Sequence, residues 1–202
     1  IGLGYVGLPL AVEKARAGYH VLGFDVQDEK VNKVNRGENY IGDIIPEELN
    51  RLVETGFLAA SSDFGRIAEC DVVTICVPTP LDEFKQPDLS YIEASAKEIA
   101  PRLHQGMLVV LESTTYPGTT EEVVKPILEG TGLSCGGDFL LAFSPERVDP
   151  GNAQYKTHNT PKVVGGCGPE SAAAAQLLYE TILGAPVFMV SSPKEAEAAK
   201  IL

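Results

Sequence analysis

The sequence predicts an α/β fold in which a doubly wound parallel sheet carries helices on both faces. Strand and helix patterns alternate along the whole chain, without a low-complexity linker or a short repeat. A nearly continuous apolar run, from Val72 to Val77, is typical of a strand buried on both faces of a parallel sheet. A glycine-rich turn, GLGYVG, stands directly before a helical pattern, as at the ligand-binding edge of such sheets.

The first elements follow from their apolar periodicity and their stop signals. Apolar residues recur at helical spacing from Leu8 to Ala15, and Gly18 ends the helix. The next segment, HVLGFD, predicts a short buried strand. The segments after it predict a short helix over 29–37, a helix from Pro46 to Gly56, a strand over 57–63 and the strand from Val72 to Val77.

The remaining elements continue the alternation. A helix is expected over 87–103, with Asp88 or Ser90 near its cap. After it the patterns predict, in order, a strand over 107–112, a helix over 118–130, a strand over 139–144, a loop to about Pro161, a strand over 162–166, a helix over 169–183, a strand over 186–190 and a helix from about Ser192.

The glycine-rich turn predicts a dinucleotide-binding site of the Rossmann type. Gly2, Gly4 and Gly7 fit the GxGxxG pattern, in which glycines permit a tight turn, the approach of a pyrophosphate and close packing of helix on strand. Asp25 ends the next strand, near the roughly 20-residue offset expected of the acid that holds the adenosine ribose hydroxyls. A carboxylate there repels a ribose 2′-phosphate, which favours NAD over NADP.

The strand ahead of the glycine turn is the central strand of this architecture and is expected to hold about five apolar residues. Only Ile1 precedes Gly2. We therefore expect the first strand to be truncated and the chain to be a fragment. Because a central strand is flanked on both sides, we also expect its loss to lower stability.

Composition narrows the classes of partner. Sixteen basic residues against 28 acidic ones give a formal charge of −12, which disfavours nucleic-acid and anionic-membrane partners. No apolar run approaches the ~20 residues of a membrane helix, and the start lacks the basic region of a signal peptide. Cys70, Cys76, Cys135 and Cys167 show no CxxC spacing and form no metal pattern with the histidines, which predicts reduced thiols in a cytoplasmic protein and no bound metal.

Three polar loops follow predicted strands: VPTP, ESTTYPGTT and SPERVDPG. Ligands bind at the carboxyl ends of strands in such sheets, on the edge that the glycine turn also faces. Taken singly, each loop has an ordinary structural explanation, with proline and glycine for turns and hydroxyls for caps. Their common position on one edge favours a binding site.

Together these motifs resemble the UDP-sugar 6-dehydrogenase family. The resemblance rests on GLGYVGLP, Asp25 with Lys30, CVPTPLDEFKQPDLSYI, ESTTYPGTT, SPERVDPG and EAEAAK, in this order along essentially the whole chain. VPTPL followed by PDLSYI, together with SPERVDPG, is more similar to the branch that oxidises UDP-N-acetylglucosamine or UDP-N-acetylmannosamine. The UDP-glucose branch usually differs at Arg147 and Val148, where it carries other residues.

The resemblance implies a reaction and a cofactor site. Family members oxidise the sugar 6-hydroxyl twice to a carboxylate, with two NAD, through an aldehyde held on a cysteine thiol and a thioester that is then hydrolysed. A UDP-sugar is the implied substrate. The residues matched to the NAD site are Gly2, Gly4, Tyr5, Val6, Gly7, Asp25, Lys30, Val77, Pro78, Thr79, Ser113, Thr114 and Thr115.

The resemblance also implies three catalytic residues. Thr114 would orient a water or the substrate hydroxyl, Glu146 would act as general base in thioester hydrolysis, and Lys200 would stabilise the developing oxyanion. Glu146, Arg147 and Val148 would contact the substrate. Without the family, Glu146 is equally well a solvated loop acid, Arg147 a salt-bridge partner and Lys200 an exposed lysine on an alanine-rich helix.

The sequence lacks one catalytic motif that the resemblance implies for a complete enzyme of the family. The resemblance implies a nucleophilic cysteine in a later glycine-rich motif, and none of the four cysteines has that context. We expect residues 1–190 to form the NAD-binding domain and 191–202 to begin the helix that leads to central and UDP-binding domains. The fragment alone is expected to be inactive, and the full-length protein to form a homodimer or a higher homo-oligomer.

Other functions stay open at this point. UDP-glucose 6-dehydrogenase is the nearest alternative. A dehydrogenase of the 3-hydroxyacid or 6-phosphogluconate type shares the glycine turn and the acid, and a non-catalytic NAD-binding module would share them as well.

Overall fold

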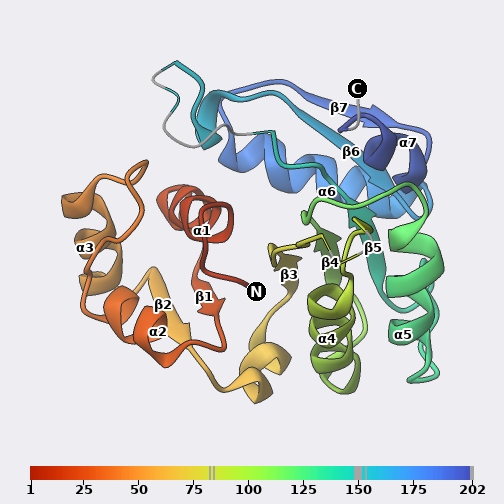
Figure 1. Ribbon diagram of the computed structural model, residues 1–202, viewed down its shortest axis with the longest axis horizontal. Helices are drawn as coiled ribbons and strands as arrows, with labels where there is room; N and C mark the ends of the chain where they lie inside the picture. The colour runs from red at the N-terminus through yellow and green to blue at the C-terminus, as the bar shows by residue number, and fades with distance from the viewer. Residues whose placement is uncertain (82, 84, 148–151, 153, 201–202) are drawn as a thin grey trace.

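The computed structural model describes residues 1–81, 83, 85–147, 152 and 154–200. Its strands form a two-stranded sheet, β1-β2, and a five-stranded sheet in the order β3-β4-β5-β6-β7, as Figure 1 shows. The strands are β1 Val21–Phe24, β2 Leu58–Ser61, β3 Val72–Ile75, β4 Leu108–Leu111, β5 Leu140–Phe143, β6 Lys162–Gly166 and β7 Val187–Val190. The α-helices are α1 Gly7–Arg16, α2 Asp28–Asn35, α3 Pro46–Glu54, α4 Ser90–Ile99, α5 Lys125–Glu129, α6 Pro169–Ile182 and α7 Pro193–Ala198.

The predicted α/β alternation is confirmed element by element, with differences at the ends. The helix expected over 118–130 consists of a π-helical turn, Thr120–Val124, followed by α5. The helix expected over 87–103 consists of α4 and a 3-10 turn, Ala100–Arg102, and further 3-10 turns lie at Phe64–Glu69 and Thr157–Asn159, where no helix was expected. Ser192 is the N-cap of the last helix, α7, where its hydroxyl accepts a hydrogen bond from the backbone N–H of Glu195.

One strand pair departs from the expected parallel sheet. β1-β2, β3-β4, β4-β5 and β6-β7 are parallel, but β5 and β6 are antiparallel, with Ala142 opposite Gly166 and Phe143 opposite Gly165. A parallel return needs a crossover, usually a helix. In its described part the segment between β5 and β6 contains only the turn Thr157–Asn159, so the chain enters β6 from the edge at which it left β5.

Helices cover both faces of the five-stranded sheet, as predicted. Neighbouring residues of β4 point to opposite faces: Val109 packs in a cluster with Ile92 of α4, and Val110 in a cluster with Tyr179 of α6. α1 joins the two sheets, because Leu8 packs with the β1-β2 core while Leu10 packs on the α6 side. The polar loops are thereby held on a rigid support.

The backbone at the start of the chain lies between the two sheets. The amine of Ile1 donates to the carbonyl of Thr74 at 2.7 Å, the N–H of Cys76 donates to the carbonyl of Ile1 at 2.8 Å, and the N–H of Gly2 donates to the carbonyl of Phe24 at 2.7 Å. Ile1 and Gly2 thus connect the carboxyl ends of β3 and β1, which do not pair with each other among the described strands.

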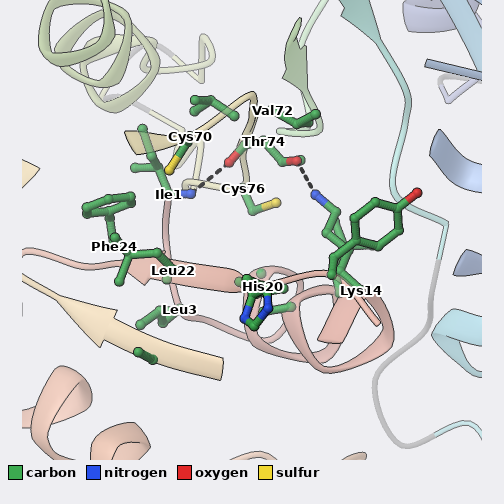
Figure 2. Close-up of a pocket in the computed structure, with 18 of the residues that line it drawn as sticks. Ile1, Leu3, Lys14, His20, Leu22, Phe24, Cys70, Val72, Thr74 and Cys76 are labelled. Atoms are coloured by element: carbon green, nitrogen blue, oxygen red, sulfur yellow. Dashed lines mark hydrogen bonds between the residues drawn. The ribbon is translucent and has the colours of Figure 1, made fainter. Parts of the chain in front are cut away.

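A cavity of about 470 Å³ lies alongside this junction (Figure 2). Its lining includes Ile1, Lys14, Phe24, Val72, Thr74 and Cys76. The Nζ of Lys14 donates to the hydroxyl of Thr74 across it. The cavity therefore separates the facing edges of β1 and β3 along the length where a central strand is expected.

None of the helices in the described part of the chain is long and apolar enough to span a membrane.

Candidate active site

The glycine turn has the tight geometry that GxGxxG requires. Gly2 has φ +90°, and a Cβ there would lie 2.7 Å from the carbonyl oxygen of Cys76. A Cβ on Gly7 would lie 1.7 Å from the carbonyl oxygen of Gly2, so only glycine lets α1 start so close to the strand end. A Cβ on Gly4 would meet no atom within 4 Å. Protein atoms therefore pack against the turn at Gly2 and Gly7 but leave space at Gly4, where a pyrophosphate fits.

The N-terminus of α1 is suited to an anion. Its N-cap, Val6, makes no side-chain cap, and the first turn, all of it described, holds no acidic residue. The N–H groups at this end therefore carry the positive end of the helix dipole, and no acidic side chain of the first turn offsets it. The residues present fit the diphosphate of a dinucleotide.

Substitution of Gly4 tests this fit directly. We expect Gly4→Ala, made in the complete protein that contains this chain, to leave the melting temperature unchanged, because the new methyl group meets no protein atom. The methyl would occupy the space that a pyrophosphate needs, and a clash of about 1–3 kcal/mol raises the Kd for NAD about tenfold or more. Calorimetric titration and thermal melts measure the two effects.

Gly42→Ala is the matched control for this prediction. Gly42 also has open space around a Cβ and an ordinary φ, but it lies outside the glycine turn. It should change neither the melting temperature nor the Kd. An unchanged NAD affinity in Gly4→Ala would contradict the placement of the pyrophosphate at this turn.

Asp25 lies beside the glycine turn, as predicted. It is 7% exposed, and its carboxylate accepts hydrogen bonds from the backbone N–H of Leu3 at 2.9 Å and of Gln27 at 3.0 Å. Lys30, in the first turns of α2, pairs with it at 3.4 Å. The structure thus places the acid and the lysine, predicted to hold the adenosine ribose, beside the glycine turn, predicted to hold the pyrophosphate.

The loops after β3 and β4 are joined to each other. The hydroxyl of Ser113 donates to the carbonyl of Val77 at 2.7 Å, and the hydroxyl of Thr79 donates to the carbonyl of Thr114 at 2.5 Å. Ser113 and Thr115 are buried, whereas Thr114 is exposed. Of the three residues of this loop that are matched to the NAD site, Thr114 is therefore the one that presents its side chain to solvent.

Glu146 and Lys200, distant in sequence, meet after β5. The Nζ of Lys200 donates to the backbone carbonyl of Glu146, and the guanidinium of Arg147 donates to the carbonyl of Ala199 at 2.6 Å. Glu146 is 5% exposed, so it is not a solvated loop acid. Burial lowers the pKa of Lys200, with the nearby Glu146 opposing that effect. Val148, the third predicted substrate contact, lies outside the described residues.

A buried carboxylate fixes the helix that precedes Lys200. Glu197 of α7 accepts hydrogen bonds from the N–H of Gly118 at 2.5 Å, from the N–H of Thr120 at 2.9 Å and from the hydroxyl of Thr120 at 2.7 Å. These donors lie at the end of the ESTTYPGTT loop, where the π-helical turn Thr120–Val124 begins. Glu197 thus attaches α7 to the loop that carries Thr114.

Two charged residues of this region, Glu112 and Lys162, are not among the site residues predicted from the motifs. Glu112 follows β4 and Lys162 begins β6, and both side chains are buried. Lys162 pairs with Glu112 and, at 3.2 Å, with the Oε2 of Glu146. In the sequence each residue is visible as a charge next to an apolar strand, Glu112 after β4 and Lys162 at the start of β6. Nothing in the sequence indicates that the two side chains face each other.

The thiol of Cys76 is held in an unreactive form. It lies 3.8 Å from the Oε2 of Glu112, and burial, together with that carboxylate, raises its pKa to about 12. Burial likewise raises the pKa of Cys70, whereas a hydrogen bond from Cys167 lowers the pKa of Cys135. A neutral thiol is a poor nucleophile, so Cys76 does not have the properties of a catalytic cysteine.

Alkylation of the native protein tests this assignment. With iodoacetamide at pH 8, mapped by mass spectrometry, we expect Cys135 to be modified well before Cys76, because the thiolate is the reactive species. The same reagent in guanidinium chloride, where no environment distinguishes the thiols, should modify all four at similar rates. Early modification of Cys76 in the folded protein would contradict the prediction.

The glycine turn, the acid at the end of β1 and the loops at the carboxyl ends of β3 and β4 define a dinucleotide-binding domain of the Rossmann type. The chain belongs to the UDP-glucose/GDP-mannose dehydrogenase family: residues 1–183 match its NAD binding domain. The cofactor of this domain is NAD, in agreement with the prediction made from Asp25. The resemblance noted from the sequence motifs is thereby confirmed.

Known relatives agree in sequence and in structure. UDP-N-acetyl-D-glucosamine 6-dehydrogenase of Pseudomonas aeruginosa is 39% identical over 203 residues, which cover 100% of this chain and 47% of the relative. The UDP-D-ManNAc dehydrogenase structure from Pyrococcus horikoshii superposes with a TM-score of 0.93 at 36% identity, over 99% of this chain and 48% of that one. A ternary complex of GDP-mannose dehydrogenase from Pseudomonas aeruginosa gives a TM-score of 0.92 at 30% identity, over 99% and 47%. The chain spans about half the length of these relatives.

Proposed function

We propose that the chain is the cofactor-binding part of an NAD-dependent UDP-N-acetylhexosamine 6-dehydrogenase, and that it supplies half of the catalytic site. The observation that carries the proposal is the meeting of Glu146 and Lys200 at the sheet edge where the NAD-binding loops also end. The relatives named for UDP-N-acetylated sugars support the choice of substrate.

The cofactor residues have separate tasks in this proposal. NAD, when bound, accepts the hydride removed from the sugar carbon. Gly2, Gly4, Tyr5, Val6 and Gly7 line the pyrophosphate, and Asp25 with Lys30 holds the adenosine ribose. Val77, Pro78 and Thr79 flank the middle of the dinucleotide, and Ser113, Thr114 and Thr115 its nicotinamide end. The net charge of −12 means that the anion is held by these local groups and not by attraction to the whole surface.

The catalytic residues act on the sugar carbon. Thr114, whose side chain is exposed, orients the reacting hydroxyl or water. Glu146 takes the proton of the attacking water as general base, and its burial excludes competing solvent. Lys200 places its ammonium beside the Glu146 backbone, where it stabilises negative charge as it develops on the reacting oxygen. Arg147 and Val148 contact the substrate.

The organisation of the complete protein belongs to the same proposal. Residues 1–190 form the NAD-binding domain and 191–202 begin the connection to the rest of the enzyme, which acts in the cytoplasm as a homodimer or a higher homo-oligomer. Sedimentation of the complete protein would establish its oligomeric state.

The deciding experiment measures NADH formed per UDP-sugar consumed by the complete protein. The substrates compared are UDP-glucose and the UDP-N-acetyl derivatives of glucosamine, mannosamine and galactosamine. Two NADH per molecule with an N-acetylated sugar are expected, because a hydroxyl becomes a carboxylate by two hydride transfers. Turnover of UDP-glucose alone would move the protein to that branch of the family, and no NADH from any of them would overturn the proposal.

A further inference from the structure

Lys162 is a buried cation at the centre of the candidate catalytic site. Its side chain is 4% exposed, and its Nζ pairs with Glu112, whose side chain is fully buried, and with the Oε2 of Glu146 at 3.2 Å. The ammonium also lies 4.9 Å from the ring centroid of Tyr179, within cation–π range. Burial of a charge is costly unless it is paired, so this arrangement requires a lysine with both carboxylates in place.

The antiparallel strand brings Lys162 to Glu146. In the β5-β6 register Ala142 lies opposite Gly166 and Phe143 opposite Gly165, and the same register continued for three residues sets Glu146 opposite Lys162. Because β6 runs against β5, its first residue lies at the edge where β4 and β5 end. A parallel β6 would start at the other edge and would leave Glu146 without this cation.

Both oxygens of the Glu146 carboxylate are thereby held by groups of fixed position. Oε1 accepts the backbone N–H of Arg147 at 2.8 Å, and Oε2 faces the Lys162 ammonium. On the other side, the ammonium pairs with Glu112, which directly precedes the Ser113–Thr115 loop. The network spans the ends of β4 and β5 and the start of β6.

We propose that Lys162 is a positioning residue that holds the Glu146 carboxylate in its reactive orientation and couples it, through Glu112, to the Ser113–Thr115 loop. The inference rests on the proposed function, in which Glu146 is the general base. Burial on its own lowers the pKa of the Lys162 ammonium, but Glu112 and Glu146 outweigh it and hold that pKa above its usual value. Lys162 therefore stays charged over the range in which Glu146 works.

The ion pair between Lys162 and Glu146 should affect the acid limb of the pH profile of kcat, where the rate rises as the general base ionises. The titratable and charged groups around the network come from six elements or their ends: Lys14 on α1, Cys76 after β3, Glu112 after β4, Arg147 after β5, Tyr179 on α6 and Lys200 after α7. Among these groups, Lys162 forms an ion pair with the Glu146 carboxylate, at 3.2 Å. An opposite charge at this range lowers the pKa of a carboxyl by about 1–3 units, so removing it raises the pH at which Glu146 ionises.

The test compares wild type, Lys162→Met and Lys162→Arg in the complete protein, with Lys97→Met as a matched control on the exposed face of α4. We expect Lys162→Met to move the acid limb of kcat upward by about one pH unit or more. The Kd for NAD should stay unchanged, because the hydrogen bonds and ion pairs of the Lys162 ammonium go to Glu112 and Glu146 and not to the glycine turn. Lys162→Arg keeps the positive charge, so its acid limb of kcat should lie at the wild-type pH. Lys97→Met should also leave the pH of that limb unchanged.

A second measurement needs no turnover. With glutamate labelled by ¹³C at the side-chain carboxyl, the Glu146 signal is assigned as the one lost in Glu146→Gln, and its titration midpoint should rise by a similar amount in Lys162→Met. If Lys162→Met fails to fold, Lys162→Met/Glu112→Gln, which removes one unpaired buried carboxylate, takes its place. A normally folded variant with an unmoved midpoint would overturn the role of Lys162. Absence of NADH formation in wild type would overturn only the proposed function, and the titration would still decide on Lys162.

Discussion

Replacing Glu146 with glutamine in the complete protein is expected to lower the rate of uronate formation by about 10²–10⁴-fold, the range attributed to a positioned general base. Glutamine keeps the size of the side chain and can still accept from the N–H of Arg147, but it cannot take a proton from water. The carboxylate is 5% exposed, so bulk solvent does not replace it readily. Steady-state NADH formation with the preferred UDP-sugar measures the effect.

Two controls separate catalysis from folding and cofactor binding. Glu170→Gln removes an exposed carboxylate from the first turn of α6 and should leave the rate unchanged. In Glu146→Gln the Kd for NAD should stay within about twofold of wild type, since the bonds described for the Glu146 side chain go to Arg147 and Lys162, which are not assigned to the cofactor. A variant that keeps a wild-type rate would remove Glu146 from the mechanism.

Extending the chain ahead of Ile1 with an apolar segment is expected to raise the free energy of unfolding of this domain. A segment of about six residues, five of them apolar, would continue the backbone of Ile1 between the facing edges of β1 and β3 and fill the cavity there. Burial of an apolar side chain contributes about 1.5–3 kcal/mol, and ordering each residue costs about 1–2 kcal/mol. With ladder hydrogen bonds on both sides, a net gain of about 3–5 kcal/mol is expected, or about 10 °C in melting temperature.

The matched comparison is an extension of the same length made of glycine and serine. It adds the same number of residues but no apolar surface, so the melting temperature of residues 1–202 should not change. Thermal unfolding followed by circular dichroism of the three chains distinguishes the effects. Equal melting temperatures for the apolar and the glycine-serine extensions would show that the space between β1 and β3 does not accept a strand.

Much of the fold was predictable because its signals are local. The glycine turn, the periodicity of α1 and the acid after β1 lie within one short segment, and the structure confirms that Asp25 meets the turn through the N–H of Leu3. The direction of β6 was not predictable. Its sequence, KVVGG, has the same apolar pattern whichever way the strand runs, and direction depends on the path of the loop before it.

The candidate site was predictable only in part, for a similar reason. Glu146 and Lys200 were named from motifs, and the structure brings them into contact across 54 residues of chain. Glu112 opens the ESTTYPGTT motif and Lys162 belongs to none, and their pairing depends on the antiparallel register of β6. A single sequence displays the type of residue at a strand end but not the residue that faces it.

The attachment of α7 has a consequence for how this region tolerates change. α7 is six residues long, and its orientation depends on the Glu197 carboxylate, whose donors lie 77 and 79 residues earlier. Gly118 has φ +108°, which strains any other residue, and Thr120 supplies a hydroxyl donor, so a substitution at either is expected to displace Lys200 without touching it. In a saturation mutagenesis map, this turn would look as intolerant as a catalytic loop although none of its side chains takes part in the chemistry, and compensating second-site changes would be found on α7.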